Sequence, residues 1–382
     1  MRPFASAVLE PDPDGVTVLT GPNGSGKTTL LEAVAYLGSQ RALRTAARDV
    51  MVRAGAERAI VRALCTREGR PLLVESELLA TGVARTQVNR QTVRGRAALA
   101  RALPVSIFSP DDLGIVQGPP SRRREVLDAT LRVLDATAAQ DLDDLERVLR
   151  QRGALLRQAG GRLSTEIEAT LDVWDARLAS AGGAVATARA ALVDQLGPFV
   201  ADAYGAIAAD SAREAREGGV REAREGTRSE LTGALGTDVG EARGRDSVAL
   251  TYRRSWDGTL ADALAASRRD DVRRATSTVG PQRDDLSFSL GARDARVAAS
   301  QGEQRTVALA LRLGVHRLVT DRVGAPPLLL LDDVFSELDP VRSLALVRYL
   351  PPGQALLTTA AELPDGVEVA ARLDVRTLGE RP

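Results

Sequence analysis

The chain has 382 residues, enough for two or three compact units, and its 44% hydrophobic content supplies a large core. Its 51 basic and 51 acidic residues cancel, which excludes a global cationic field drawing the protein onto nucleic acid or membranes. The single cysteine, Cys65, excludes an internal disulfide framework. No apolar run approaches the roughly 20 residues of a membrane span, and Met1-Arg2-Pro3-Phe4 does not open a signal peptide, so we expect a soluble cytoplasmic protein.

The first part of the chain has the pattern of a mixed α/β unit. Residues 16–20 are β-branched and apolar, which predicts a strand, and apolar spacing after Lys27 predicts a helix to about Leu37. Helical spacing dominates from Ser121 to about Leu196, with a break at Gly160-Gly161. Alternating or continuous apolar residues before that helical part predict further strands at 58–64, 71–79 and 105–108 and a hairpin at 83–93.

The charged segment 211–246 separates the helical part from a second α/β part. It contains a near-repeat of Ala-Arg-Glu units and almost no large apolar side chain, which favours a solvated or disordered insert over a functional charged arm. The sequence therefore predicts an α/β unit made of residues 1–118 and 271–382, interrupted by a mostly helical insert at 119–270. The elements predicted after Asp262 are strands at 286–290, 328–331 and 355–359 and a helix at 302–319.

A phosphate-binding loop is predicted between the first strand and its helix. Glycines let successive N–H groups point at one phosphate chain, and the helix N-terminus adds a partial positive charge. Lys27 would reach the β- and γ-phosphates of ATP, and the Thr28 hydroxyl would hold Mg²⁺. Lys27 is the only lysine among 51 basic residues, which indicates that this site requires a compact ammonium. The run matches the Walker A pattern in Gly21, Pro22, Asn23, Gly24, Ser25, Gly26, Lys27 and Thr28, followed by Thr29.

Two acidic residues follow the all-leucine run at 328–331, in a Walker B arrangement. A buried strand would deliver Asp332 to Mg²⁺ at the carboxyl edge of the sheet, and Asp333 would orient the attacking water. With Lys27, these two acids are the predicted catalytic residues. A strand that merely meets a polar loop is the alternative, which the Walker A loop disfavours. The residues that follow resemble the D-loop of ABC ATPases, with Ser336 and Asp339 as its polar members.

The helix before this strand opens with Ser300, Gln301, Gly302 and Glu303, which resemble the ABC signature. In ABC ATPases this serine and helix terminus bind the γ-phosphate held by the Walker A loop of a second copy. The resemblance therefore implies an ATP-dependent homodimer. Taken alone, the same run is an ordinary helix start, with Ser300 capping and Glu303 completing a capping box, and we expect that role as well.

The spacing of the motifs narrows the family. Lys27 and Ser300 are separated by most of the chain, whereas transporter motors place them closer, and the insert is too poor in heptads for a Rad50-like ATPase. Nearly end to end, the chain resembles the RecF family of DNA replication and repair proteins. The pieces that carry this resemblance, besides the Walker and signature motifs, are Phe108-Ser109-Pro110-Asp111-Asp112-Leu113, Gly118-Pro119-Pro120-Ser121-Arg122-Arg123-Arg124 and Gly280-Pro281-Gln282-Arg283-Asp284-Asp285-Leu286.

This resemblance implies an α/β fold: an ABC-ATPase head of the P-loop NTPase type, with a mixed sheet and an inserted helical second lobe. It implies ATP and Mg²⁺ as cofactors and weak, DNA-stimulated ATP hydrolysis. It further implies an ATP-dependent dimer on double-stranded and gapped DNA that works with RecR and RecO to load RecA. Family members usually begin with a strand and a Phe-Arg-x-Phe/Tyr segment, so we expect the first strand to be missing here. Gln282 stands where the family often has histidine.

Several residues outside these motifs are further candidates. Arg41, Arg44 and Arg48 follow the Walker A helix and are candidates for contacts to DNA phosphates, with a solvated cluster as the alternative. The arginines at 122–124 have the same two interpretations, and we expect a solvated cluster there. Gln117 is the candidate Q-loop glutamine that links the lobes, and His316, the sole histidine, is expected to be structural.

Two other functions stay open. A transporter motor would need a switch histidine after the last apolar strand, where this chain has threonines. An ATPase-linked nuclease would need an additional acidic metal cluster, for which the sequence shows no candidate. Measuring DNA-dependent ATPase activity together with the ATP-dependent dimer mass distinguishes a RecF-type ATPase from a transporter motor and from an ATPase-linked nuclease.

Overall fold

The computed structural model describes residues 4–40, 51–67, 69–80, 85–93, 95–225, 247–360 and 362–379, without the side chains of 210–225. The candidate DNA-binding residues Arg41, Arg44 and Arg48 lie outside the described residues. Within the described part of the chain, no helix is long and apolar enough to span a membrane.

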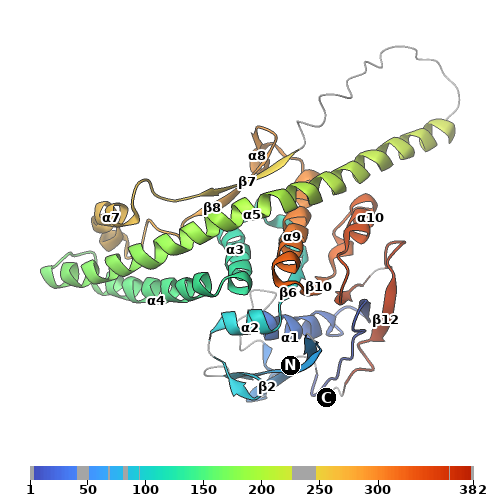
Figure 1. The fold of residues 1–382 in the computed structure, drawn as a ribbon, viewed down its shortest axis with the longest axis horizontal. Helices are drawn as coiled ribbons and strands as arrows, with labels where there is room; N and C mark the ends of the chain where they lie inside the picture. Colours follow the sequence, from blue (N-terminus) through green and yellow to red (C-terminus); the bar gives the residue numbers. More distant parts are fainter. Residues whose placement is uncertain are drawn as a thin grey trace, which may run out of the picture.

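A five-stranded parallel sheet forms the centre of the α/β unit, in the order β12-β1-β11-β10-β6. Helix α1 (Lys27–Ser39) covers one face, where its Leu31 packs against Leu330 and Leu356. Helix α9 (Gln301–Val323) and helix α10 (Pro340–Tyr349) lie on the other face (Figure 1). Strands β10 and β11 are apolar up to their last residue because helices bury both of their faces. The strands are β1 (Val16–Thr20), β6 (Val105–Phe108), β10 (Leu328–Asp332), β11 (Ala355–Thr358) and β12 (Val369–Asp374).

A second, antiparallel sheet packs beside α1, in the order β2-β3-β4-β5. Leu37 of α1 shares a small core with Val74 of this sheet and Leu99 of α2. More and less buried residues alternate along β2 and β3, as expected of strands that face the core on one side. The elements are β2 (Arg58–Arg67), β3 (Arg70–Leu79), β4 (Arg85–Val88), β5 (Gln91–Thr92) and α2 (Arg96–Ala102).

The helical part consists of α3 (Pro120–Leu134), α4 (Ala136–Gln158), α5 (Thr165–Glu225) and α7 (Leu260–Arg274). The sequence predicted the helical pattern only to about Leu196, but α5 continues through Pro198. The residue before this proline is Gly197, whose missing Cβ removes one of the clashes that proline imposes on a helix. Residues 211–225, the first part of the charged segment, also belong to α5.

A three-stranded antiparallel sheet joins the helical part to the α/β unit. Strand β7 (Val248–Arg253) pairs with β8 (Asp285–Leu290), which pairs with β9 (Arg293–Asp294). The predicted boundary at 270/271 therefore falls between two strands of one sheet. The short helix α8 (Ala295–Ala298) follows β9 and leads into α9.

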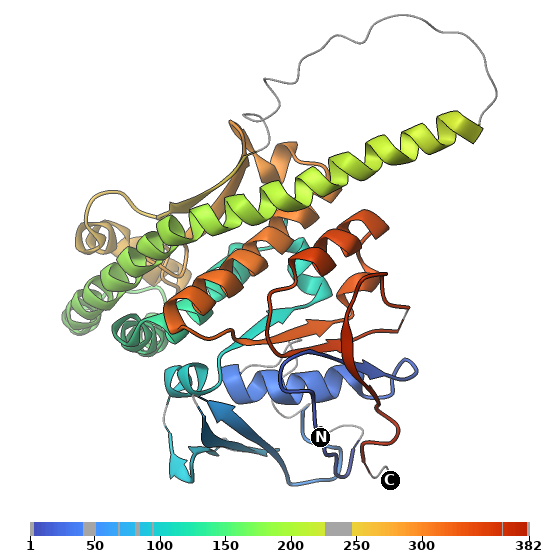
Figure 2. The same cartoon turned by 45° about the vertical axis from the view of Figure 1, so that its right-hand side comes forward.

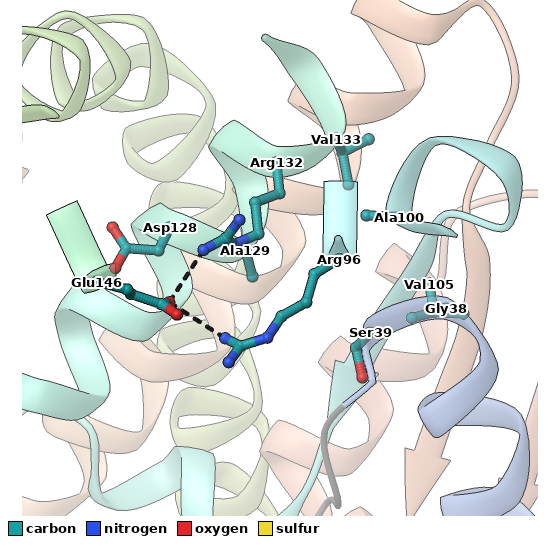
Figure 3. A pocket seen from close by; sticks show the side chains of 10 residues that line it. All are labelled: Gly38, Ser39, Arg96, Ala100, Val105, Asp128, Ala129, Arg132, Val133 and Glu146. Carbon is teal, nitrogen blue, oxygen red and sulfur yellow. Dashed lines mark hydrogen bonds and ion pairs between the residues drawn. The ribbon is translucent and has the colours of Figure 1, made fainter. Parts of the chain in front are cut away.

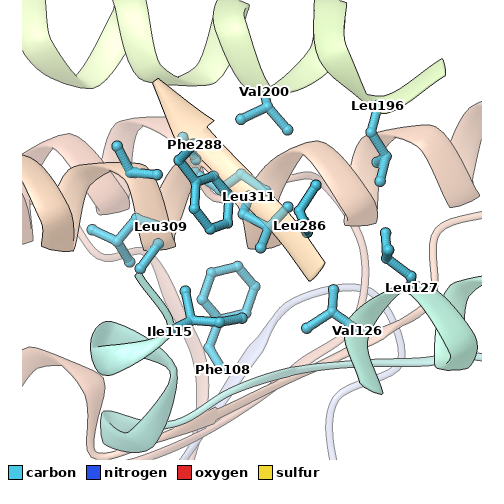
Figure 4. Packing of buried hydrophobic residues seen from close by; sticks show 14 of the residues in the cluster. Phe108, Ile115, Val126, Leu127, Leu196, Val200, Leu286, Phe288, Leu309 and Leu311 are labelled. Carbon is cyan, nitrogen blue, oxygen red and sulfur yellow. The ribbon is translucent and has the colours of Figure 1, made fainter. Parts of the chain in front are cut away.

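The main core lies where α3, α5, α9 and β8 meet (Figure 4). Helices α5 and α9 approach closely there, because a Cβ added to Gly314 of α9 would lie 2.7 Å from a methyl group of Val200. The side chains that fill this core come from elements far apart in sequence, and include Phe108, Ile115, Val126, Leu127, Leu196, Val200, Leu286, Phe288, Leu309 and Leu311.

Candidate nucleotide-binding site

The predicted phosphate loop connects β1 to α1, as the Walker A pattern requires. Gly21, Gly24 and Gly26 have φ of 146°, 76° and 103°, values that favour glycine. At Gly21 space is also short, because an added Cβ would lie 2.9 Å from Oγ of Ser25. Gly26 is the N-cap of α1 and has no side chain to bond the first helical N–H groups. Both the conformation of the loop and the helix start therefore fit a bound phosphate chain.

Lys27 lies inside this loop and is 8% exposed. Its Nζ donates to the carbonyl oxygens of Gly21 at 2.6 Å and Pro22 at 3.2 Å. The loop therefore curls around the ammonium group at the start of α1. A positive charge at this position is suited to the phosphates of a nucleotide, which supports the prediction from the sequence.

Asp332 ends β10 and is 1% exposed. The hydroxyl groups of two threonines donate to the same carboxylate oxygen, Oδ1: Thr28 at 2.9 Å and Thr358 at 2.8 Å. Thr28 and Asp332 are thus brought together from positions 304 residues apart. Within the described ranges, no group of three or more His, Cys, Asp or Glu side chains is arranged to hold a metal by itself. A hydroxyl beside one carboxylate fits Mg²⁺, which usually takes its remaining ligands from substrate phosphates and water.

Thr358 is a site residue that the sequence analysis did not single out. It ends the apolar strand β11 and lies opposite Asp332 in the parallel register. Besides its bond to Asp332, its Oγ1 accepts from the backbone N–H of Asp333 at 3.1 Å. The available signal was a threonine at the end of an otherwise apolar strand, at the edge where the other site residues lie.

Asp333 adopts the left-handed conformation, with φ of 49°. Its backbone N–H also donates to the carbonyl oxygen of Thr358 at 3.0 Å, and its carboxylate accepts from the N–H of Ala360 at 3.4 Å. This residue is half-buried, whereas Asp332 beside it is buried. The turn thus gives the two neighbouring acids different environments, as separate roles in metal binding and water orientation would require.

The signature residues begin α9. Ser300 is the N-cap, and its Oγ accepts from the N–H of Glu303 at 3.3 Å while the Glu303 carboxylate accepts from the N–H of Ser300 at 2.7 Å. The bonds from the backbone and side chain of Ser300 hold the pKa of Glu303 below its usual value, with further help from Arg293 and Arg342. The predicted capping box is therefore confirmed. Gln301 is exposed and Gly302 is partly buried against Arg342.

The two halves of the expected ATP site lie in different parts of the molecule. The loop that holds Lys27 leads into α1, while α8 leads into the signature. Helices α1 and α8 are well separated in both views of the fold (Figures 1 and 2). This arrangement fits a site assembled from two copies of the chain, as the resemblance implied.

The remaining predicted residues occupy the connections around these halves. Ser336 Oγ donates to the carbonyl oxygen of Asp333 at 2.8 Å, and Asp339 caps α10. The Nε2 of Gln117 donates to the carbonyl oxygen of Arg296 in α8, at 2.6 Å. Gln117 therefore connects the loop after the short helix at Pro110–Gly114 to the segment before the signature.

A pocket at the opposite end of α1 is separate from this site (Figure 3). It is lined by Gly38 and Ser39 of α1 and by residues of α2, α3 and α4. Glu146 accepts from Arg96 at 3.3 Å and from Arg132 at 3.0 Å, so a carboxylate already bonds both guanidinium groups. The charges of the two arginines in this pocket are therefore balanced within the chain.

Comparison with known proteins agrees with the motifs. The family model described as the RecF/RecN/SMC N terminal domain matches residues 1–358. A relative from Beutenbergia cavernae, the DNA replication and repair protein RecF, is 40% identical over 98% of this chain and 95% of its own length. The chain belongs to the RecF family. The RecF of Arthrobacter sp. (strain FB24) is 37% identical over 97% of this chain and 94% of its own length.

Solved RecF structures have the same fold. The recombination mediator protein RecF of the RecFOR pathway with ATPrS has a TM-score of 0.76 at 25% identity, over 94% of this chain and 89% of its own. The structure of the recombination mediator protein RecF with ATP has a TM-score of 0.74 at 25% identity, over 93% of this chain and 88% of its own length. The predicted fold class, an α/β ABC-type head, is therefore confirmed, but the five described strands of its central sheet are all parallel rather than mixed.

Two of the three further RecF pieces, 118–124 and 280–286, lie against each other. Arg123 is 2% exposed, and its Nε and Nη2 donate to the two carboxylate oxygens of Asp285 at 2.7 and 3.0 Å. Arg124 donates to the carbonyl oxygen of Asp284 at 2.6 Å. The expectation of a solvated arginine cluster is wrong for Arg123, and only Arg122 remains largely exposed. The cause is a partner more than 150 residues away, which local sequence does not reveal.

His316, which we expected to be structural, lies buried in α9 and is 1% exposed. Burial, together with the nearby charge of Arg317, lowers the pKa of its imidazole from 6.5 to about 4. The side chain is therefore neutral at physiological pH and contributes to packing.

Proposed function

We propose that this chain binds ATP at the Walker loop, hydrolyses it slowly, and acts as an ATP-dependent, DNA-binding recombination mediator. The observation that carries the proposal is the meeting of Thr28 and Asp332 beside the buried Lys27. The names of the relatives support it, since they are DNA replication and repair proteins and one solved relative is a recombination mediator.

Each residue has a distinct role in this reaction. Lys27 moves its ammonium group from the loop carbonyl oxygens to the phosphates and neutralises their charge. The N–H groups of the loop orient the phosphate chain. Thr28 and Asp332 would hold Mg²⁺, which would supply neutralisation of the phosphate charge when bound. Asp333 accepts a hydrogen bond from the attacking water and fixes its direction. Thr358 holds Asp332 in place through the bond described above.

The second half of the site, in this proposal, comes from another copy. Ser300, Gln301 and Gly302 contact the γ-phosphate held by the partner's loop, so ATP links two chains head to tail. Hydrolysis removes that γ-phosphate and lets the dimer open. The functional outcome of ATP hydrolysis is then a change in the assembly state of the protein.

DNA and the partner proteins complete the proposal. The dimer binds double-stranded DNA near single-strand gaps and works with RecR and RecO to promote RecA loading, with DNA stimulating a weak ATPase. The 1–118, 119–270 and 271–382 division is kept as a proposal for the two lobes, with Gln117 as a link between them.

ATP turnover in the presence and absence of gapped duplex DNA tests the proposal. We expect DNA to raise turnover in the wild type, and Lys27→Ala and Asp333→Asn to abolish it. Reversing Arg41 and Arg44 together to glutamate should weaken duplex binding at low salt while leaving ATP binding unchanged. Turnover that ignores DNA in the wild-type chain would contradict the proposal.

A further inference from the structure

Arg342 lies in the first turn of α10, and its guanidinium covers the signature glycine. A Cβ added to Gly302 would lie 3.0 Å from Cζ of Arg342 and closer still to one of its nitrogens. The guanidinium therefore occupies the space that any other side chain at this signature position would need. The signature turn and α10 are fitted to each other at this point.

The same guanidinium connects α9 to the D-loop. Its Nε donates to Oγ1 of Thr306 at 3.1 Å, and its Nη1 forms an ion pair with Asp339. Thr306 in turn donates to the carbonyl oxygen of Gly302 at 3.0 Å. Burial opposes ionisation of Asp339, but the backbone N–H and guanidinium of Arg342 hold its pKa below the usual value. A planar guanidinium can bond a hydroxyl and a carboxylate at once, which a lysine ammonium at the same position does less well.

The D-loop continues this connection to the proposed water-orienting acid. Ser336 Oγ donates to the carbonyl oxygen of Asp333 at 2.8 Å. A second hydrogen bond connects α9 to the D-loop without involving Arg342: Arg305 of α9 donates to the carbonyl oxygen of Glu337 at 2.7 Å. A contiguous set of hydrogen bonds and short backbone segments thus joins the signature turn to the backbone of Asp333, the residue that follows β10 in the same chain.

We propose that Arg342 is a positioning residue that couples the signature turn to Asp333, so that a nucleotide of a second copy, on meeting the signature, adjusts the hydrolytic site of the first. This inference rests on the proposed function, since it requires the signature to meet the nucleotide of another copy. Its consequence is that the two sites of a dimer hydrolyse ATP in a coordinated way. Displacing Arg342 uncouples them without touching the loop that holds Lys27.

Three variants separate coupling from simple structural damage. Arg342→Ala removes the guanidinium but keeps the backbone N–H that bonds the Asp339 carboxylate at 3.0 Å, so the start of α10 is retained. Thr306→Val removes the hydroxyl partner with little change in volume. Arg342→Lys keeps the positive charge opposite Asp339 but lacks the planar guanidinium that bonds Thr306 and Asp339 at once. Arg348→Ala, an exposed arginine on the same helix, is the matched control.

The measurements are ATP affinity at low protein concentration, dimer mass with ATP, and steady-state turnover as a function of ATP. For Arg342→Ala and Thr306→Val we expect ATP affinity within about twofold of wild type, about tenfold lower kcat, and loss of cooperativity between sites. Arg342→Lys should recover less than half of the lost kcat, and Arg348→Ala should match wild type.

Wild-type kcat and cooperativity in both Arg342→Ala and Thr306→Val would overturn the inference. So would an equal loss of ATP affinity and kcat, because Arg342 would then act on the loop of its own chain. A wild-type protein that never dimerises with ATP would instead sink the proposed function, so the two failures are distinguishable.

Discussion

Replacing Thr358 by valine tests whether the Walker B carboxylate depends on the neighbouring strand. The substitution keeps the size of the side chain but removes the hydroxyl that donates to Asp332 at 2.8 Å and accepts from the N–H of Asp333 at 3.1 Å. Asp332 is 1% exposed, so water cannot readily replace the lost donor. We therefore expect the carboxylate that should hold Mg²⁺ to be less well fixed.

The size of the effect follows from the kind of bond removed. A hydrogen bond to a charged group contributes about 1.5–3 kcal/mol, and each 1.36 kcal/mol corresponds to a factor of ten in rate. Thr358→Val should thus lower kcat/KM for ATP by about 10- to 150-fold and raise the Mg²⁺ concentration needed for half-maximal turnover. Thr358→Ser, which keeps the hydroxyl, should recover most of the activity.

Steady-state ATP hydrolysis over a Mg²⁺ titration provides the measurement, with thermal unfolding as the check on folding. A Thr358→Val protein that melts like wild type and keeps its kcat/KM and Mg²⁺ dependence within twofold would refute the reasoning. In that case the bonds from Thr358 would not position Asp332.

Other consequences of the structure are testable by single substitutions. Because the folded pKa of His316 is lowered from 6.5 to about 4, only the unfolded chain takes up a proton between these values. Stability should then fall by up to about 3 kcal/mol as pH drops from 6.5 to 4, and chemical denaturation of His316→Leu should show a smaller fall. Arg123→Met leaves the carboxylate of Asp285 without its partner and should cost about 3–5 kcal/mol in urea unfolding, whereas Arg122→Met should cost under about 0.5 kcal/mol. Gly21→Ala forces a Cβ to within 2.9 Å of Ser25 and should weaken ATP binding in an equilibrium titration by at least about tenfold, while normal binding would show that the loop relaxes at no cost.

The local parts of the fold were predictable from sequence. The strands β6 and β10 were predicted because short apolar runs end at turn or acidic residues, and the Walker loop was predicted because its glycines and lysine occupy fixed spacings. The capping box was likewise predictable from Ser300 and Glu303, two residues within one helical turn. Each of these features depends on neighbours within a few positions.

What could not be predicted depends on contacts between distant segments. The burial of Arg123 requires Asp285, and the role of Thr358 requires the register of β11 against β10. The passage of α5 through Pro198 depends on apolar residues on both sides, such as Val200, that pack against α9. Arg342 belongs to the same class, because nothing in its own helix indicates that it covers Gly302.

The mass of the protein with ATP, measured by sedimentation for the wild type, Lys27→Ala and Ser300→Ala, tests the central claim most directly. If each ATP site is built from the loop of one copy and the signature of another, wild type dimerises with ATP and both variants stay monomeric. Lys27→Ala should also lose ATP binding, whereas Ser300→Ala should bind ATP as a monomer with nearly wild-type affinity. A Ser300→Ala protein that dimerises normally with ATP, or a wild type that remains monomeric, would contradict the account.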